Sequence, residues 1–357
     1  MAGPYRGAMR FMTDPVSIAR VRELILKEPN LNVLRDEYKG RYAPLVEAIE
    51  REIKRRSDSG KLLLPDLSAL ANQTVGIFSD YGGEGSGNYC TYSFLLCSFG
   101  SLAPFQRQMK EIRAKYSMGT KEIEFKDFGM GLIRTALPAY LGALNGYVPG
   151  LLFTLVVDKR LLSLFGPQDR ATTKALAKIL DEKGLGQRTP AVAEKLLRVV
   201  HTAAYLVGLL GHEGQKIFWM TDHDAICANN GMHNRLMAAF HDVLGLYSGR
   251  RYGLISGARP FDERSTDYLD LLSAADIAAG SVEQYFTSRD SLGQHDARVK
   301  EGAEKVLQWL GQDGLGLKKL CVMISRGEDG TIMSGSVDFV SKEVPADATF
   351  VPIELCR

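Results

Sequence analysis

The sequence has few cysteines, and they do not occur in pairs. The five cysteines are an odd number, they are scattered along 357 residues, and no Cys-x-x-Cys pair occurs. This pattern argues against a zinc site and against a framework of disulfide bonds. Free thiols in a reducing compartment are expected instead, so the sequence predicts a cytoplasmic protein.

Long apolar runs are also missing. No stretch approaches the roughly 18 consecutive apolar residues that a membrane-spanning helix requires. Residues 1–14 (MAGPYRGAMRFMTD) contain no apolar core of the kind found in signal peptides. We therefore expect no transmembrane helix and no membrane partner.

Common nucleotide and zinc-protease motifs are absent. The glycine-rich segment 82–87 is not followed by Gly-Lys-Ser/Thr, and the chain then re-enters a strand pattern. It is therefore neither a Walker A loop nor a dinucleotide fingerprint. His212-Glu213 lacks a second histidine at the zincin spacing, so His212 is expected to be a loop residue. The formal net charge of +2 neither indicates nucleic acid nor excludes a local basic groove.

What is present is an alternation of strand and helix patterns in a chain with 45% hydrophobic and 24% charged residues. After a helical region at 15–57, a strand pair over 75–96 is followed by alternating helices and strands, which favours a mixed α/β sheet flanked by helices. Strands are expected within 75–96, 121–128, 150–160, 215–226 and 318–340, with the last hairpin turning at Gly330, and a short strand and a loop are expected within 252–268. Helices are expected within 101–119, 129–147, 169–183, 190–210, 229–247, 269–286 and 299–311.

Acidic residues stand where a carboxylate is unexpected. Asp80 and Asp222 end apolar strand patterns, and Asp276 interrupts an apolar helix. Burial of an unpaired carboxylate is unfavourable, so each needs a partner. Asp80 can bond backbone amides in a turn, and a basic side chain or a helix N-terminus can pair with Asp276. Alternatively, carboxylates that converge from several elements bind Mg²⁺ or Mn²⁺.

Five motifs, taken in order, resemble those of a known family. They are SDYGG at 79–83, EIEFKDF at 122–128, VVDK at 156–159, MTDHD at 220–224 and LLSAADIAAG at 271–280. The order is similar to that of an uncharacterised microbial family, domain of unknown function thirty-eight hundred, which has an RNase H-like (retroviral integrase superfamily) fold. The resemblance covers roughly residues 72–288. Tyr81 stands where the family has Glu, and Ser273 stands where it has Gln.

The resemblance implies both a fold and a site. Residues 72–290 are expected to form an RNase H-like mixed sheet flanked by helices. Residues 1–71 would be an N-terminal helical extension, and residues 291–357 a C-terminal helix and β-hairpin packed on the core. The implied ligands of Mg²⁺ or Mn²⁺ are Asp80, Glu124, Asp222 and Asp276.

Some positions remain open within this pattern. Lys126 is implied to act in catalysis, paired with an acid or with a substrate phosphate, and Glu122 competes with Glu124. The reserve ligands are Glu84, Asp158 and Asp224; Glu84 can replace the missing Glu, and Asp158 can instead pair with Lys159 or Arg160. His223 and His233 are either proton shuttles or surface residues. The aromatic rings of Tyr81, Tyr89 and Tyr92 either stack on bases or pack between strands.

The implied function is that of a metal-dependent nuclease that hydrolyses phosphodiester bonds by a two-metal-ion mechanism. Nucleic acid is the expected partner, and a protein partner or a homo-oligomer is also open. The main alternative is a catalytically inactive RNase H-like protein that binds nucleic acid or forms complexes, which Tyr81 in place of Glu favours. A phosphatase or nucleotidase that uses the same acids is a third interpretation.

Overall fold

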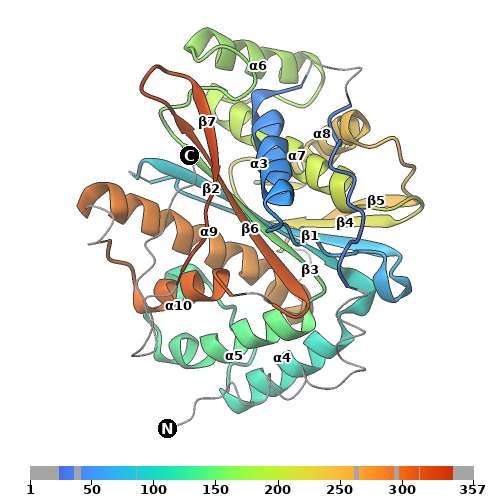
Figure 1. Ribbon diagram of the computed structural model, residues 1–357, viewed down its shortest axis with the longest axis vertical. Coiled ribbons are helices and arrows are strands. Elements are labelled where there is room, and N and C mark those ends of the chain that lie inside the picture. Colours follow the sequence, from blue (N-terminus) through green and yellow to red (C-terminus); the bar gives the residue numbers. More distant parts are fainter. Residues whose placement is uncertain are drawn as a thin grey trace.

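A seven-stranded mixed sheet forms the centre of the molecule, with helices on both of its faces (Figure 1). The computed structural model describes residues 24–35, 42–85, 87–260, 265–292, 297–312 and 314–340. The α/β class expected from the sequence is therefore confirmed. The strands are β1 (Thr74–Gly82), β2 (Tyr89–Ser98), β3 (Gly150–Asp158), β4 (Lys216–Thr221), β5 (Leu254–Ala258), β6 (Leu317–Arg326) and β7 (Ile332–Ser336).

The strand order is β5-β4-β1-β2-β3-β6-β7. β2 runs antiparallel to β1 and β3, and β7 runs antiparallel to β6. The pairs β1–β4, β4–β5 and β3–β6 are parallel. Strands β1, β3, β4, β5 and β6 therefore share one direction, and their carboxyl ends lie along one edge of the sheet. Crevices at that edge are where open α/β sheets bind ligands.

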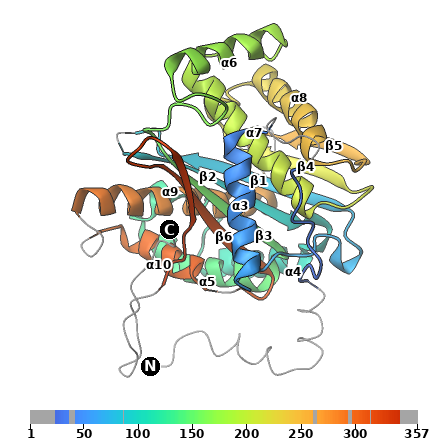
Figure 2. The same ribbon diagram turned by 45° about the horizontal axis from the view of Figure 1, so that its top comes forward.

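The helices divide between the two faces (Figure 2). On one face α3, α7 and α8 bury their apolar residues against the sheet, and α6 packs on α7. On the other face α4, α5, α9 and α10 do the same. The bounds are α3 (Pro44–Asp58), α4 (Ala103–Lys115), α5 (Gly131–Tyr147), α6 (Arg170–Glu182), α7 (Pro190–Leu210), α8 (Asn230–Tyr247), α9 (Thr266–Leu292) and α10 (Glu301–Leu310).

Alternation of side chains along β1 decides which face receives its acid. Val75 and Ile77 belong to the core on the α7 face, whereas Phe78 belongs to the core under α9. Because successive side chains in a strand point to opposite faces, Asp80 shares the face of Phe78. The strand does not end on Asp80 as the sequence suggested, because pairing with β2 continues to Gly82.

A buried ion pair fixes α9 on this face. Asp270 of α9 binds Arg113 of α4, with 3.1 Å between Arg113 Nε and Asp270 Oδ2 and a second contact from Arg113 Nη2 to Oδ1. Burial raises the pKa of Asp270, and the Arg113 guanidinium acts against that rise. The Tyr140 hydroxyl of α5 also donates to the Asp270 carbonyl oxygen at 2.6 Å. These contacts place the rest of α9, including Asp276, relative to the sheet.

Two expectations about secondary structure are wrong. Residues 24–35 form no helix but an irregular segment with a single bridge, Ile25 to Pro65; residues 15–23 of that expected helical region lie outside the described residues. Residues 121–128 form no strand: after an extended stretch, Phe125–Asp127 makes a 3-10 turn, η4. The reason is packing, because Phe125 and Phe128 fit against Gly280 of α9 and Gly302 of α10 rather than beside a strand.

The described residues also bear on the expected absence of membrane spans and on the cysteines. None of the described helices is both long enough and apolar enough to cross a membrane. The cysteines at positions 90, 97, 227 and 321 are free thiols. Burial raises the pKa of Cys227 to about 12, so this thiol is protonated at neutral pH.

Candidate metal centre

Two of the predicted acids lie side by side at the carboxyl ends of β1 and β4. Ser79 pairs with Thr221 in the parallel register, and the backbone N–H of Asp222 donates to the Ser79 carbonyl oxygen at 3.0 Å. Asp80 and Asp222 therefore follow neighbouring positions of adjacent strands. Met220 lies in the core under α9, so Asp222 shares its face by the same alternation that governs Asp80.

The third acid reaches this face from α9. Glycine allows the helix to approach closely, because a Cβ on Gly82 would lie 3.4 Å from the Ala279 carbonyl oxygen and 2.6 Å from Thr91 Oγ1. Thr91 Oγ1 itself donates to the Ala279 carbonyl oxygen at 3.0 Å. The helix thereby brings Asp276 over the ends of β1 and β4. The three acids approach one another from the same face of the sheet.

The segment that carries Glu124 is held by the same helix. The backbone N–H of Phe125 donates to Asp276 Oδ2 at 2.6 Å. A Cβ on Gly280, one helical turn beyond Asp276, would lie only 2.3 Å from Cγ of Phe125. Gly280 therefore makes the notch that seats the Phe125 ring, and Glu124 comes next to Asp276 as a consequence.

The charges of the carboxylates in this cluster act on their neighbours and shift their pKa values. The pKa of Asp276 is raised to about 7: burial contributes most, the charges of Glu124 and Asp222 add to the rise, and the hydrogen bond from Phe125 opposes it. Burial also raises the pKa of Asp80 well above its ordinary value, with added repulsion from Asp276 and Asp222. The pKa of Asp222 is raised by burial first and then by Asp224 and Glu124.

The donor chemistry of this cluster suits a hard cation. No ion pair joins Asp80, Asp222 or Asp276 to a basic side chain within the described parts of the chain. Like charges gathered without a counter-ion are unfavourable, and a divalent cation removes that cost. Among the described residues no group of three or more His, Cys, Asp or Glu side chains is already gathered tightly enough to hold a metal ion. The carboxylates are neighbours that a cation would draw together.

The two residues beside Glu124 have distinct positions. Lys126 Nζ lies 2.7 Å from Glu124 Oε1, and its side chain is 73% exposed. Lys126 is thus a cation at the rim that is paired with an acid. Burial raises the pKa of Glu122, as do the charges of Glu124 and Asp222. Both glutamates therefore lie near Asp222, and Glu124 also acts on the pKa of Asp276.

A lysine that sequence reasoning missed joins the two reserve acids on the α7 side. Lys195 of α7 is ion-paired with Asp224, and its Nζ lies 2.5 Å from Glu84 Oε1. The ammonium also lies 5.1 Å from the centre of the Tyr81 ring. Glu84 therefore binds Lys195 instead of joining Asp80, while Asp224 still raises the pKa of both Asp80 and Asp222. A lone lysine within the apolar stretch AVAEKLLRVV was the signal for this position.

Tyr81, which follows Asp80 directly, points away from the carboxylate cluster. The Tyr81 side chain lies on the opposite face from Asp80, where its hydroxyl is 2.8 Å from both Ser79 Oγ and Thr221 Oγ1. Its ring packs against Tyr92 and Phe94 of β2. Tyr92 and Tyr89 are buried, so packing between strands, rather than base stacking, describes these aromatic residues.

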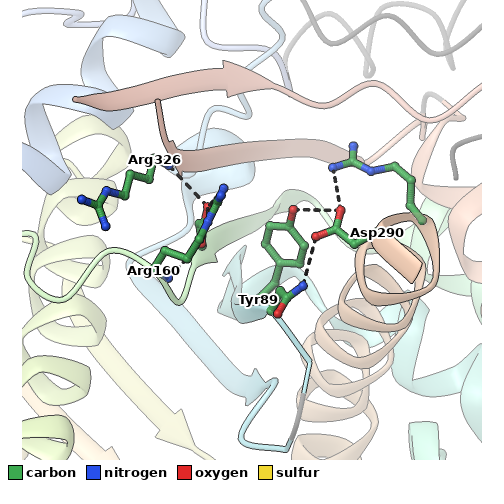
Figure 3. Close-up of polar contacts among 7 residues, drawn as sticks. Tyr89, Arg160, Asp290 and Arg326 are labelled. Atoms are coloured by element: carbon green, nitrogen blue, oxygen red, sulfur yellow. Dashed lines mark hydrogen bonds and ion pairs between the residues drawn. The ribbon is translucent and has the colours of Figure 1, made fainter. Parts of the chain in front are cut away.

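The reserve acid Asp158 belongs to a separate ion-pair network further along the sheet edge. Arg160 Nε lies 2.9 Å and Nη2 lies 2.6 Å from Asp158 Oδ2. Burial would raise the pKa of Asp158, but the hydrogen bonds and charge of Arg160 outweigh burial and lower it. Figure 3 shows Tyr89 between Arg160 and Asp290; the Tyr89 hydroxyl donates to Asp290 Oδ1 at 3.1 Å. Asp158 thus already has a cationic partner and lies apart from Asp80.

The histidines considered as proton shuttles are placed as follows. His223 is exposed beside Asp222, and its Nε2 lies 2.8 Å from the Ala228 carbonyl oxygen. His233 is buried on α8, where it packs against Gly257 of β5. His212 pairs with Asp66 at 3.3 Å in the loop before β4, at the opposite end of that strand from Asp222. Of these three histidines, His223 lies next to the acids.

Comparison with known proteins adds no identification. No protein-family model matches the chain, and a search of curated proteins finds no match. The geometry of the acids and the sequence motifs therefore carry the functional argument.

Proposed function

We propose that this protein is a metal-dependent nuclease that hydrolyses phosphodiester bonds of nucleic acid. The observation that carries the proposal is the approach of Asp80, Asp222 and Asp276 on one face of the sheet without a basic partner among the described residues. Asp222 and Asp276 raise the pKa of Asp80, and Asp222 raises the pKa of Asp276. They are far apart in sequence and arrive on two strands and a helix. Glu124 completes an oxygen-only donor set of the kind that Mg²⁺ and Mn²⁺ prefer.

The topology supports an RNase H-like core. Strands β3-β2-β1-β4-β5 are adjacent in that order, with β2 alone reversed. The RNase H-like fold is a five-stranded sheet of this order and direction. In this chain β6 and β7 extend the sheet beyond β3, and β6 pairs with β3 over nearly its whole length. The free thiols of the four described cysteines fit the proposal of a reducing, cytoplasmic environment.

In this proposal the acids bind the cation and the lysines act on the charge of the substrate and of the site. Asp80, Asp222, Asp276 and Glu124 would hold one or two divalent cations, which activate a water and stabilise the leaving oxygen when bound. Lys126, exposed and hydrogen-bonded to Glu124, can move to a substrate phosphate. Lys195 keeps Asp224 neutralised and so limits the total negative charge that a phosphate meets.

The runner-up function is a protein that binds nucleic acid, or forms complexes, without cleaving. The observation that favours it is the absence, in the described residues, of a preassembled group of three metal-binding side chains. A phosphatase or nucleotidase with the same acids is a third possibility. In all three, the acids at β1, β4 and α9 form the site.

The test is a cleavage assay with Mg²⁺ or Mn²⁺ on single-stranded and duplex RNA and DNA. We expect wild-type protein to cleave at least one of these substrates, and we expect EDTA to stop the reaction. Calorimetry should show divalent binding in the absence of nucleic acid. Nucleic-acid binding with no cleavage and no divalent binding would support the runner-up. Release of phosphate from mononucleotides alone would support the phosphatase.

Gly280→Ala should weaken metal-dependent cleavage by displacing Glu124. The new Cβ would meet the Phe125 ring at 2.3 Å, so the ring and the backbone bound to Asp276 must move. A misplacement of about 1 Å can cost roughly 100-fold in rate. Steady-state cleavage kinetics measure the effect.

The matched control for this prediction is Gly142→Ala in α5, where a Cβ meets nothing within 4 Å. That variant should keep full activity and gain up to about 1 kcal/mol in stability from helix propensity. Adding Phe125→Leu to Gly280→Ala should recover part of the lost rate by relieving the clash. Equal activity of Gly280→Ala and wild type would remove Glu124 from the site.

A further inference from the structure

Two arginines lie beside the loop that follows β4, on its α7 and α8 side. Arg188 immediately precedes Thr189, the N-cap of α7, and its Nη1 is 3.5 Å from the carbonyl oxygen of Ile226 in that loop. Arg235 comes from α8. The charge of Arg235 acts on Arg188, so the two guanidinium groups are neighbours.

Arg188 has donors without acceptors. Its Nε and Nη2 are inaccessible to solvent and have no hydrogen-bond partner in the described part of the chain. Burial lowers the pKa of Arg188, and the like charge of Arg235 lowers it further. Buried donors are almost always satisfied, because a group that loses water without gaining an acceptor costs free energy. Two neighbouring guanidinium groups with unsatisfied donors would be stabilised by an anion that accepts hydrogen bonds from them.

The surrounding residues do not supply that anion. No hydrogen bond or ion pair joins Arg188 or Arg235 to a carboxylate among the residues that the structure describes. Among the residues that the structure describes, the acid that acts on the charge of Arg188 is Asp224, which is ion-paired with Lys195. The nearby Cys227 is a neutral thiol because burial raises its pKa to about 12.

The loop between α6 and α7, which contains Gly186 and Arg188, lets the side chain of Arg235 approach closely. Gly186 has a φ of +89°, and a Cβ at this position would lie 2.5 Å from Arg235 Nη1 and 3.0 Å from its Cζ. Only glycine combines this backbone conformation with this approach. The guanidinium of Arg235 therefore lies against the backbone of the same loop that carries Arg188.

We propose that Arg188 and Arg235 form a phosphate-binding site, in which one phosphate group lies between the two guanidinium groups. Arg235 is exposed, so its long side chain can turn aside and let a phosphate reach the donors of Arg188. Asp224 acts electrostatically on Asp80 and on Arg188, which makes the arginine pair a neighbour of the carboxylate cluster. The assignment of this phosphate to the strand being cleaved, next to the scissile one, rests on the proposed nuclease function.

The first test measures phosphate binding with the metal removed. In EDTA, inorganic phosphate should raise the melting temperature of wild type, because ligand binding stabilises the folded state. Arg188→Gln and Arg235→Gln should each reduce phosphate affinity about tenfold or more, the usual loss for a charge-assisted hydrogen bond. Arg251→Gln, an exposed arginine before β5 at the opposite edge of the sheet, should bind phosphate as wild type does.

The same melts separate binding from a structural role. Without phosphate, Arg188→Gln should melt at the wild-type temperature or higher, because it removes unsatisfied donors. A large drop in melting temperature for Arg188→Gln, with its response to phosphate unchanged, would overturn the site. Equal phosphate responses in wild type, Arg188→Gln and Arg235→Gln would overturn it too.

A second measurement tells this proposal apart from the nuclease. Affinity for a single-stranded oligonucleotide in EDTA is measured against salt concentration, and each arginine variant should lower the slope of log K against log salt by about one. If wild type never cleaves but its phosphate response depends on Arg188, the nuclease fails and the anion site stands. If wild type cleaves and both variants keep the wild-type KM and salt slope, the anion site fails alone.

Discussion

Asp80→Asn should abolish divalent-dependent cleavage while the fold remains intact. Asn keeps the shape of Asp and can still accept the hydrogen bond from the Tyr81 backbone N–H, but it lacks the charge that holds a cation. Metal ions supply several kcal/mol of transition-state stabilisation, so the cleavage rate should fall by about 100-fold or more. Cleavage kinetics with Mg²⁺ and with Mn²⁺ provide the measurement.

Stability should move in the other direction, or not at all. Without metal, desolvation and repulsion by Asp276 and Asp222 disfavour the charged form of Asp80, so the loss of its charge removes a cost. Melting of Asp80→Asn in EDTA is therefore expected at the wild-type temperature or above. A structural turn residue would give the opposite result, because a turn weakens when its charged acceptor is lost.

Asp158→Asn provides a matched control at the same edge of the sheet. Asp158 is the last residue of β3, but Arg160 binds it and lowers its pKa. Its contribution to stability is present at neutral pH and is lost as pH falls through its lowered folded pKa. Asp158→Asn should therefore lose about 1–3 kcal/mol and keep its kcat. Equal loss of kcat in both variants would show that the assay reports folding rather than metal binding.

An element could be predicted from sequence wherever its own burial set its pattern of apolar and polar residues. The run GLLFTLVVD is apolar almost throughout because β3 is buried on both faces, and all of its residues are buried. The alternating charges of residues 121–128 looked like a strand, yet no strand edge in the described sheet receives them. The conformation of residues 121–128 is set instead by Gly280 of α9 and Gly302 of α10, against which Phe125 and Phe128 pack. A local pattern cannot reveal a notch made by residues far away in sequence.

Some residues of the candidate site could likewise be predicted from local sequence, and others depend on contacts between distant elements. Asp80 and Asp222 could be predicted because acids at parallel strand ends meet at one edge. Asp276 was detectable because a carboxylate in an apolar helix requires a partner. Lys195 was not found, because its ion pairs to Glu84 and Asp224 depend on how α7 crosses the sheet. Asp270 resembled Asp276 as an acid in the same helix, and only the contact with Arg113 separates this structural acid from the proposed metal ligand.

Asp276→Asn should remove the pH dependence that Asp276 gives to the stability of the metal-free protein. The folded pKa of Asp276 is about 7, whereas an unfolded Asp titrates near 3.9. Between these values the folded state binds more protons than the unfolded state. Stability is therefore greatest at low pH and is lost as pH rises from the unfolded pKa through 7. The Asn variant lacks this loss, so above pH 7 it should be more stable than wild type by on the order of 2–4 kcal/mol.

With divalent cations, wild type should become more stable than Asp276→Asn above pH 7, the opposite of the order expected in EDTA. Deprotonated ligands bind metal, so added Mg²⁺ or Mn²⁺ should stabilise wild type more as pH rises, and Asp276→Asn should lose this gain. Asp270→Asn is the control in the same helix: it leaves Arg113 buried against a neutral partner, a loss of about 3–5 kcal/mol, but it should keep the metal-induced rise in melting temperature. Thermal melts from pH 5 to 9, with EDTA or with Mg²⁺, separate the two acids. If Asp276→Asn is less stable than wild type at pH 8 in EDTA and still gains stability from Mg²⁺, Asp276 is a structural acid and the proposed metal centre fails.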